Sequence, residues 1–194
     1  MIRALWTAST GMKAQQVHMD VIANNLANVN SSGFKKSRAD FQDILYQTSK
    51  AAGTGVDGGE VPTGVQVGLG SRVAAVQKVF TTGDFQQTEN ELDIAIEGTG
   101  FFQITLPDGT EAFTRSGAMK KDSTGRIVTS DGYPIFPEVV LPENSTAVTI
   151  SPGGEVEVIL DGETTPTQVG NIDLVRFANP AGLKSLGRNL YAET

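Results

Sequence analysis

The feature that most constrains this chain is a helical repeat of large apolar residues near its N-terminus. Four of them stand seven residues apart, namely Leu5, Met12, Met19 and Leu26. Helix-breaking residues are rare here, because the first proline is Pro62 and the only glycine before Gly33 is Gly11. The spacing predicts a single helix from about Ile2 to about Asn28, on the order of 40 Å long at about 1.5 Å per residue.

The apolar stripe of this helix is narrow, closer to a coiled-coil seam than to the broad face of a helix in a globular core. No later stretch of the chain repeats this period over a comparable length. An isolated helix is only marginally stable in water. A helix without a partner in its own chain must therefore find one in another molecule or unfold.

Composition excludes several classes of function. The chain has 22 acidic and 15 basic residues, a net charge of -7, which argues against binding to nucleic acid. It has no cysteine, which excludes disulfides, thiolate metal sites and cysteine nucleophiles. Its apolar runs are too short for a membrane span, and its N-terminus lacks the pattern of a signal peptide. Composition alone predicts a cytoplasmic protein without nucleic-acid partner or membrane insertion.

The segment after the helix has two interpretations. Residues 34–46 are either a short helix packed on the next domain or an extended connector with bulky anchors. The stretch Ser49–Gly70 is rich in glycine, which makes ordering costly and predicts a flexible loop or linker. It lacks the Lys-Ser/Thr continuation of a phosphate-binding loop.

From Arg72 onward the pattern predicts short antiparallel strands separated by turns. Pro107–Thr110 is a turn, because proline presets φ and Gly109 supplies a positive φ. Further turns are expected at 122–125, 130–132, 151–154 and 161–162, and strands at 73–78, 92–97, 101–106, 111–115, 126–129, 146–150, 155–159 and 172–177. The predicted fold is mainly β with an N-terminal α-helix: a helical arm at 1–33, an extended connector at 34–70, and an antiparallel barrel or sandwich-like domain at 71–194.

No set of side chains predicts catalysis, a cofactor or a metal. His18 is the only histidine, which argues against a metal site. Glu91 and Asp93 could be an acid pair, but strand alternation places both on a polar, solvated face. That face is opposite the apolar residues Leu92, Ile94 and Ile96. We therefore expect a protein that is not an enzyme.

An asparagine cluster interrupts the end of the predicted helix, at Asn24, Asn25, Asn28 and Asn30. Asparagine is a poor helix former, because its amide competes for backbone hydrogen bonds. One interpretation is capping where the helix ends, which accounts well for Asn28 and Asn30. The other is hydrogen bonding between helices of different subunits, which would fix their register. Both interpretations remain open for Asn24 and Asn25.

At these residues the chain resembles the bacterial flagellar rod and hook proteins. The N-terminal signature is Ile22–Asn28 followed by Gly33-Phe34-Lys35, and the opening residues look most similar to the distal rod branch of the family. Further motifs match the central β-domain and its return toward the axis: Gly98–Phe102, Phe113–Gly117, Gly125–Val128, Asp131–Tyr133 and Leu186–Thr194. The resemblance covers nearly the whole chain.

This resemblance implies a structural subunit that self-assembles into a helical tube and transmits torque to the hook. The implied partners are copies of itself, other flagellar rod and hook subunits, and the ring proteins that surround the rod. The implied location is the periplasm-spanning rod of the basal body, reached through the flagellar type III channel without a cleaved signal peptide. No cofactor is implied.

The resemblance also assigns roles to residues. The inner helix-packing seam would consist of Leu5, Met12, Met19, Ile22 and Leu26. Polar contacts that fix the register would be Asn24, Asn25 and Asn28. Phe34 and Phe41 would anchor the connector. The Ser49–Gly70 stretch corresponds to an inter-domain segment that helps to keep the rod straight. Family members continue past the position of Thr194 into a second long helix, so we expect a C-terminally truncated chain.

An alternative reading is a carbohydrate- or ligand-binding β-domain of a surface protein. Such a domain needs a cluster of exposed aromatic side chains. The chain has one tryptophan and three tyrosines, and they are scattered along the sequence.

Overall fold

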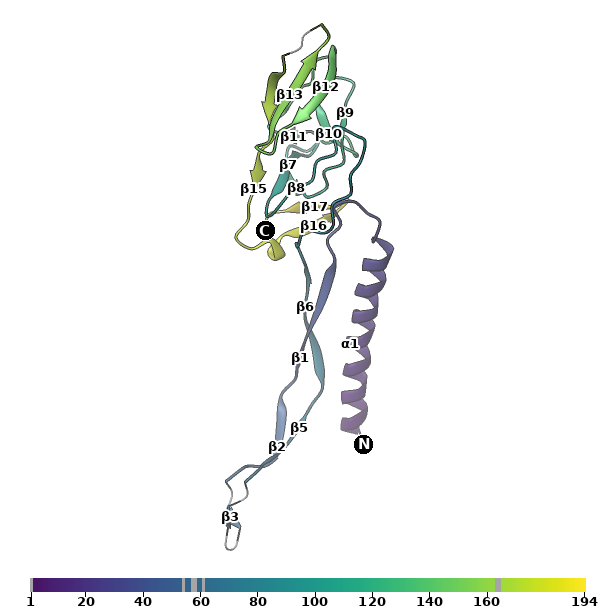
Figure 1. The fold of residues 1–194 in the computed structure, drawn as a ribbon. Helices are drawn as coiled ribbons and strands as arrows, with labels where there is room; N and C mark the ends of the chain where they lie inside the picture. Colours follow the sequence, from purple (N-terminus) through teal and green to yellow (C-terminus); the bar gives the residue numbers. More distant parts are fainter. Residues whose placement is uncertain (1, 54, 57–58, 61, 163–164) are drawn as a thin grey trace. The chain divides into compact units, whose positions relative to one another are not determined.

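The structure is a computed structural model that describes residues 2–53, 55–56, 59–60, 62–162 and 165–194. The chain divides into two compact units (Figure 1). The first consists of the chain up to Val29 together with Lys36–Val79. The second consists of Asn30–Lys35 together with Phe80–Thr194.

The first unit contains the predicted helix and a long β-hairpin. Helix α1 spans Ile2–Ala27, which confirms the prediction from apolar spacing. In the hairpin β1 (Ser37–Asp43) pairs with β6 (Ser71–Lys78), β2 (Tyr46–Lys50) with β5 (Val65–Gly68), and β3 (Gly55–Val56) with β4 (Gly59–Glu60), all antiparallel. Residues 37–43 are therefore extended, which agrees with the interpretation of this segment as an extended connector.

The glycine-rich stretch differs from its prediction. Its composition predicts a flexible loop, but its described residues include the end of β2, which pairs with β5, and β3, which pairs with β4. Residues 54, 57, 58 and 61 of this stretch lie outside the described residues. The reason for the difference is that strand pairing satisfies backbone groups across a long sequence separation, which local composition does not report.

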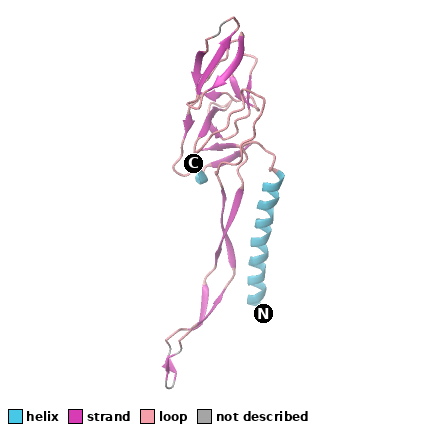
Figure 2. Cartoon of the chain, viewed as in Figure 1, coloured by secondary structure: helices cyan, strands magenta, loops and turns pink. Residues whose placement is uncertain are grey.

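The second unit is built from antiparallel sheets (Figure 2). Its largest sheet has six strands: β7 (Phe101–Thr105), β8 (Glu111–Thr114), β11 (Ile135–Phe136), β15 (Leu174–Val175), β16 (Lys184–Gly187) and β17 (Leu190–Ala192). A two-stranded sheet joins β9 (Met119–Lys121) to β10 (Ile127–Thr129), and a three-stranded sheet joins β12 (Ser145–Ile150), β13 (Glu155–Leu160) and β14 (Thr167–Asn171). A 3₁₀ turn, η1, covers Pro180–Gly182.

The mainly-β class with an N-terminal helix is confirmed, although the strand pairings of the described residues close no sheet into a barrel. Order in the big sheet is β11-β7-β8-β17-β16, with β15 also pairing to β7. The expected turn at 107–110 joins β7 to β8, and Gly109 has the predicted positive φ of 80°.

One predicted strand is wrong. Residues 92–97 form no named strand and make a single isolated bridge, from Asp93 to Ala118. The alternation nevertheless predicted the buried side correctly, because Ile96 is buried and its neighbours Leu92 and Ile94 pack against the same core. Burial of the apolar side chains determines which way they point. The segment is not a strand, because no described neighbouring strand forms a continuous set of backbone hydrogen bonds with it.

Two apolar clusters stabilise the second unit. The larger joins the three sheets through fully buried side chains such as Ile104, Ile127 and Val156. The smaller contains Phe101, Phe113 and Tyr191, whose rings pack edge-to-face with Phe80 and Phe177. Edge-to-face rings add to the stability gained from burial itself.

Candidate assembly surface

Helix α1 exposes the apolar repeat that the sequence predicted. We call Leu5, Met12, Met19 and Leu26 the apolar stripe; they are 71%, 67%, 64% and 71% exposed. Ile22, beside the stripe, is 46% exposed. Burying one such side chain contributes about 1.5–3 kcal/mol. The stripe therefore leaves a large apolar surface available for a partner.

The opposite face of α1 lies on the hairpin of its own unit. Ala14 is the buried residue of the helix, 6% exposed, and at about 100° per residue it lies roughly 200° around the axis from Met12. Nearby, Thr10 Oγ1 accepts a 3.4 Å hydrogen bond from the backbone N–H of Ser71. The helix thus has a neighbour in its own chain, which the sequence did not predict, and this neighbour leaves the apolar stripe uncovered.

The hairpin backbone comes close to the helix at Gly70. A Cβ atom added there would overlap Thr10 Oγ1, and the φ of Gly70 is +126°. Only glycine tolerates that backbone conformation and that close approach. The helix face toward the hairpin combines small or polar side chains, such as Thr10 and Ala14, with the half-buried Val17 and Val21.

The asparagines of the cluster occupy different environments. Asn25 is half-buried and forms two hydrogen bonds with the backbone of Ser37. Asn28 Nδ2 donates a 2.9 Å bond to the carbonyl of Asn24, as expected for a residue at a helix end. The side chain of Asn24 is exposed. Their predicted role in contacts between subunits stays a prediction.

The predicted anchors Phe34 and Phe41 fall in different units. Phe41 is 39% exposed in β1, and its ring centre lies 5.9 Å from that of His18 on α1 in an edge-to-face arrangement. Phe34 belongs to the second unit, is half-buried, and donates its backbone N–H to Ser31 at 3.1 Å.

Sequence reasoning missed further exposed apolar residues in the first unit. On the helix they are Ile2 and Trp6, and on the hairpin Leu45, Tyr46, Val65, Val67 and Val76. The helical residues fall outside the seven-residue repeat. Val65 and Val67 stand two apart, a strand signal that the surrounding glycines obscured.

The two acidic residues considered as an acid pair have local structural roles. Glu91 Oε2 accepts a 2.9 Å hydrogen bond from the backbone N–H of Val148 in β12. Asp93 accepts hydrogen bonds from Thr88 and Asn90, at 2.8 and 3.0 Å. Within the described residues, no group of three or more histidine or acidic side chains could hold a metal ion. No described helix is long and apolar enough to cross a membrane.

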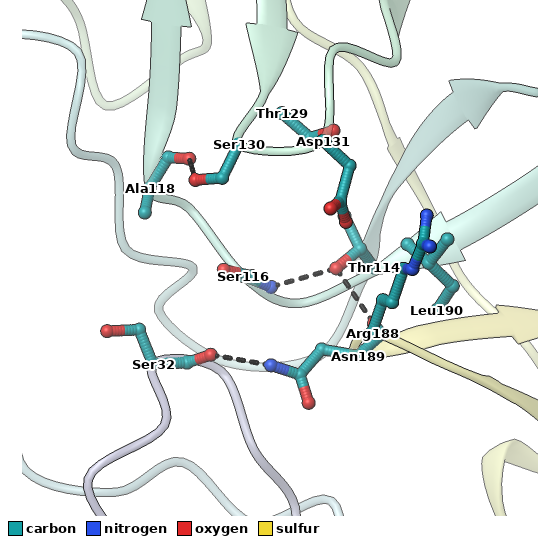
Figure 3. Close-up of a pocket in the computed structure, with 10 residues that line it drawn as sticks. All are labelled: Ser32, Thr114, Ser116, Ala118, Thr129, Ser130, Asp131, Arg188, Asn189 and Leu190. Atoms are coloured by element: carbon teal, nitrogen blue, oxygen red, sulfur yellow. Dashed lines mark hydrogen bonds between the residues drawn. The ribbon is translucent and has the colours of Figure 1, made fainter.

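An open, polar pocket lies in the second unit (Figure 3). Thr114 Oγ1 donates to the carbonyl of Asn189, and Asn189 Nδ2 donates to the carbonyl of Ser32, both at 2.9 Å. The charged residues of its wall are Asp131 and Arg188, and Arg188 donates to the Tyr133 hydroxyl at 3.0 Å. These bonds join separate chain segments of the unit. The lining residues, all of them described, contain no nucleophile–base pair.

Comparison with known proteins gives matches over the whole chain. The family model described as "Flagella basal body rod protein" matches residues 5–35, and that of the "Flagellar hook protein FlgE/F/G D1 domain" matches residues 95–158. The flagellar basal-body rod protein FlgG of Borreliella burgdorferi is 50% identical over 197 residues, covering 100% of this chain and 74% of the relative.

Two further relatives show the extent of the similarity. FlgG of Buchnera aphidicola is 47% identical over 196 residues, covering 100% of this chain and 75% of that protein. The flagellar hook protein FlgE of Helicobacter mustelae is 47% identical over 135 residues, covering 69% of this chain and 30% of that protein. The similarity to rod proteins thus includes both the helix and the β-unit.

Proposed function

The chain belongs to the FlgG family of flagellar basal-body rod proteins and is a structural axial subunit of the rod, and we propose that it packs against neighbouring subunits through the apolar stripe of α1. In this proposal the subunit belongs to the distal rod and helps to transmit torque across the periplasm to the hook.

The observation that carries the proposal is the direction of the apolar stripe. In a helix of a single globular protein the apolar face points to the core. In α1 it points away from the hairpin, and four large apolar side chains are each more than 60% exposed. A face of this kind gains stability when another copy covers it. Repeated contacts between different faces of identical subunits generate an open helical assembly, which is the geometry of a rod.

The other parts of the chain have supporting roles in this proposal. We propose residues 1–33 as the axial arm, 34–70 as the connector and 71–194 as the β-domain, although the structure groups 71–79 with the hairpin. Because β6 pairs with β1, the connector acts as a two-stranded ribbon. Asn24, with its exposed amide, is proposed as a polar contact that fixes the register of neighbouring helices.

We further propose a route and partners for the subunit. It leaves the cell through the flagellar type III channel without a cleaved signal peptide, and in the basal body it meets other rod and hook subunits and the surrounding ring proteins. The lack of cysteine suits this route, since no disulfide can form on the way.

The test is a substitution in the apolar stripe, made in the chromosomal gene of a motile bacterium that encodes this protein. Leu26→Asp places a charge on the proposed contact and should abolish swimming and hook assembly. Leu26→Met is the matched control, because it keeps the apolar surface and nearly the same volume, and should leave swimming normal.

Two measurements complete this test. Secretion of the variant, measured in the culture medium of a strain without rods, separates failed assembly from failed export. Near-ultraviolet circular dichroism of the purified chain checks that the aromatic cluster of the β-unit is unchanged. Normal swimming with Leu26→Asp would contradict the proposed contact.

A further inference from the structure

We infer that Asn25 is a positioning residue that fixes how α1 is rotated on its hairpin, and thereby which face of the helix is offered to other subunits. The starting point is the two adjacent asparagines one turn before the end of α1. Both are poor helix formers, but only Asn25 faces the hairpin; the Asn24 side chain is exposed.

The Asn25 amide binds the hairpin as a peptide group would. Its Nδ2 donates to the carbonyl of Ser37, and its Oδ1 accepts from the N–H of Ser37, both at 2.8 Å. Ser37 is the first residue of β1 and stands opposite Lys78 of β6. In an antiparallel pair the N–H and C=O of one residue point to the same side. Those of Ser37 point to the helix, where Asn25 occupies the open edge of the ribbon.

Only an amide of this length can complete this pair. A carboxylate in its place would lack the donor and would face the Ser37 carbonyl with negative charge. Asn25 therefore satisfies both backbone groups of Ser37 with one side chain.

The rest of the helix–hairpin contact cannot fix the rotation as well. Ala14 is the buried residue of α1, and the bonds of Thr7 and Thr10 with the hairpin are long, 3.5 and 3.4 Å. The bond from Arg3 to Gln47 of β2 joins two long, exposed side chains, which can follow a rotation of the helix. Small side chains allow a helix to slide or turn, whereas two short bonds to one residue are directional. A turn by one residue, about 100°, would carry the apolar stripe to a different side.

The inference rests on the proposed function only for the role of the apolar stripe, and the bond itself is tested separately. Hydrogen exchange of the Ser37 amide is measured by NMR in the purified full chain, unchanged and with Asn25→Ala, Asn25→Asp or Asn24→Ala. Alanine raises helix propensity equally at both positions, so the Asn24 and Asn25 variants are matched in that respect.

The expected result is about tenfold faster exchange of the Ser37 amide with Asn25→Ala, a smaller increase with Asn25→Asp, whose carboxylate still accepts from the Ser37 N–H but faces its carbonyl, and no change with Asn24→Ala. An unprotected Ser37 amide in the unchanged protein, or equal exchange in the Asn25→Ala variant, would overturn the inference.

The second readout is swimming of bacteria that carry the same substitutions. Asn25→Ala should abolish it although the helix propensity has increased, and Asn24→Ala should impair it less. Lost swimming with an unchanged Ser37 amide would make Asn25 a contact between subunits instead. Faster exchange with normal swimming would show that the rotation of α1 is not limiting, which also overturns the inference. Both outcomes are independent of the Leu26 test.

Discussion

Arg115 Nη1 donates a 3.0 Å hydrogen bond to the backbone carbonyl of Phe80. Its Nη2 donates to the carbonyl of Gly98, and its guanidinium carbon lies 5.7 Å from the centre of the Phe101 ring. The residue is only 9% exposed, and burial lowers the pKa of its guanidinium. The planar fork of arginine suits such a site, because it can satisfy two carbonyls and still lie against a ring. Arg115 thereby holds the segment at Phe80 on the aromatic cluster.

Replacing Arg115 with methionine should lower the free energy of unfolding of the second unit by about 2 kcal/mol. Methionine keeps the apolar stem but leaves the carbonyls of Phe80 and Gly98 without this donor. Urea denaturation, followed by near-ultraviolet circular dichroism of the aromatic cluster, measures the change. Arg126→Met is the control. Arg126 is half-exposed and its ion pairs are long, 3.4 and 3.8 Å, so its replacement should cost less than about 1 kcal/mol. Equal losses would contradict the role of Arg115.

Tyr191 should make stability fall in alkaline solution. Burial raises the pKa of its hydroxyl to about 12, while nearby Arg115 acts in the opposite direction. In the unfolded chain the pKa is about 10, so between pH 10 and 12 the unfolded state loses this proton first. The contribution of Tyr191 to the free energy of unfolding is therefore complete below pH 10. It falls by up to about 3 kcal/mol as the pH approaches 12.

The measurement for Tyr191 is the urea midpoint at several pH values from 8.5 to about 11.5, compared with the Tyr191→Phe variant. Partial burial lowers the pKa values of Lys35 and Lys78, which act with the opposite sign, so only the difference between the two proteins isolates Tyr191. The unchanged protein should lose stability relative to the variant above pH 10. Parallel curves would contradict the prediction.

Gly33→Ala should destabilise the second unit more than an ordinary glycine substitution. Gly33 has a φ of +73°, and a Cβ atom added to it would lie 2.6 Å from the Cα of Ser116. The left-handed conformation costs about 1–2 kcal/mol for a residue with a Cβ, and the overlap adds about 1–3 kcal/mol. The control is Gly109→Ala, where φ is +80° and the added atom meets nothing within 4 Å. Urea denaturation of both variants should separate the overlap from the strain, and equal losses would exclude a close contact at Ser116.

Local patterns predicted a good part of this fold. The seven-residue spacing located α1 almost to the residue, and proline and glycine located turns such as 107–110. The outward direction of Leu5 and Leu26 could not be derived from spacing, since periodicity identifies a face but not its neighbour. The resemblance to axial proteins, rather than the pattern, indicated that this face meets other subunits.

Predictions from the sequence are undecided or wrong for features that depend on residues far away in the chain. Residues 92–97 alternate like a strand yet lack a ladder, and the glycine-rich stretch pairs at its ends although its composition indicates a loop. The position of Asn25 in the sequence leaves a cap and a contact between subunits open, and the structure directs its amide to Ser37. Residue spacing reports the regularity of a segment, because that is set by neighbours along the chain. Which backbone group meets which side chain is settled only when segments far apart in sequence come within hydrogen-bond distance.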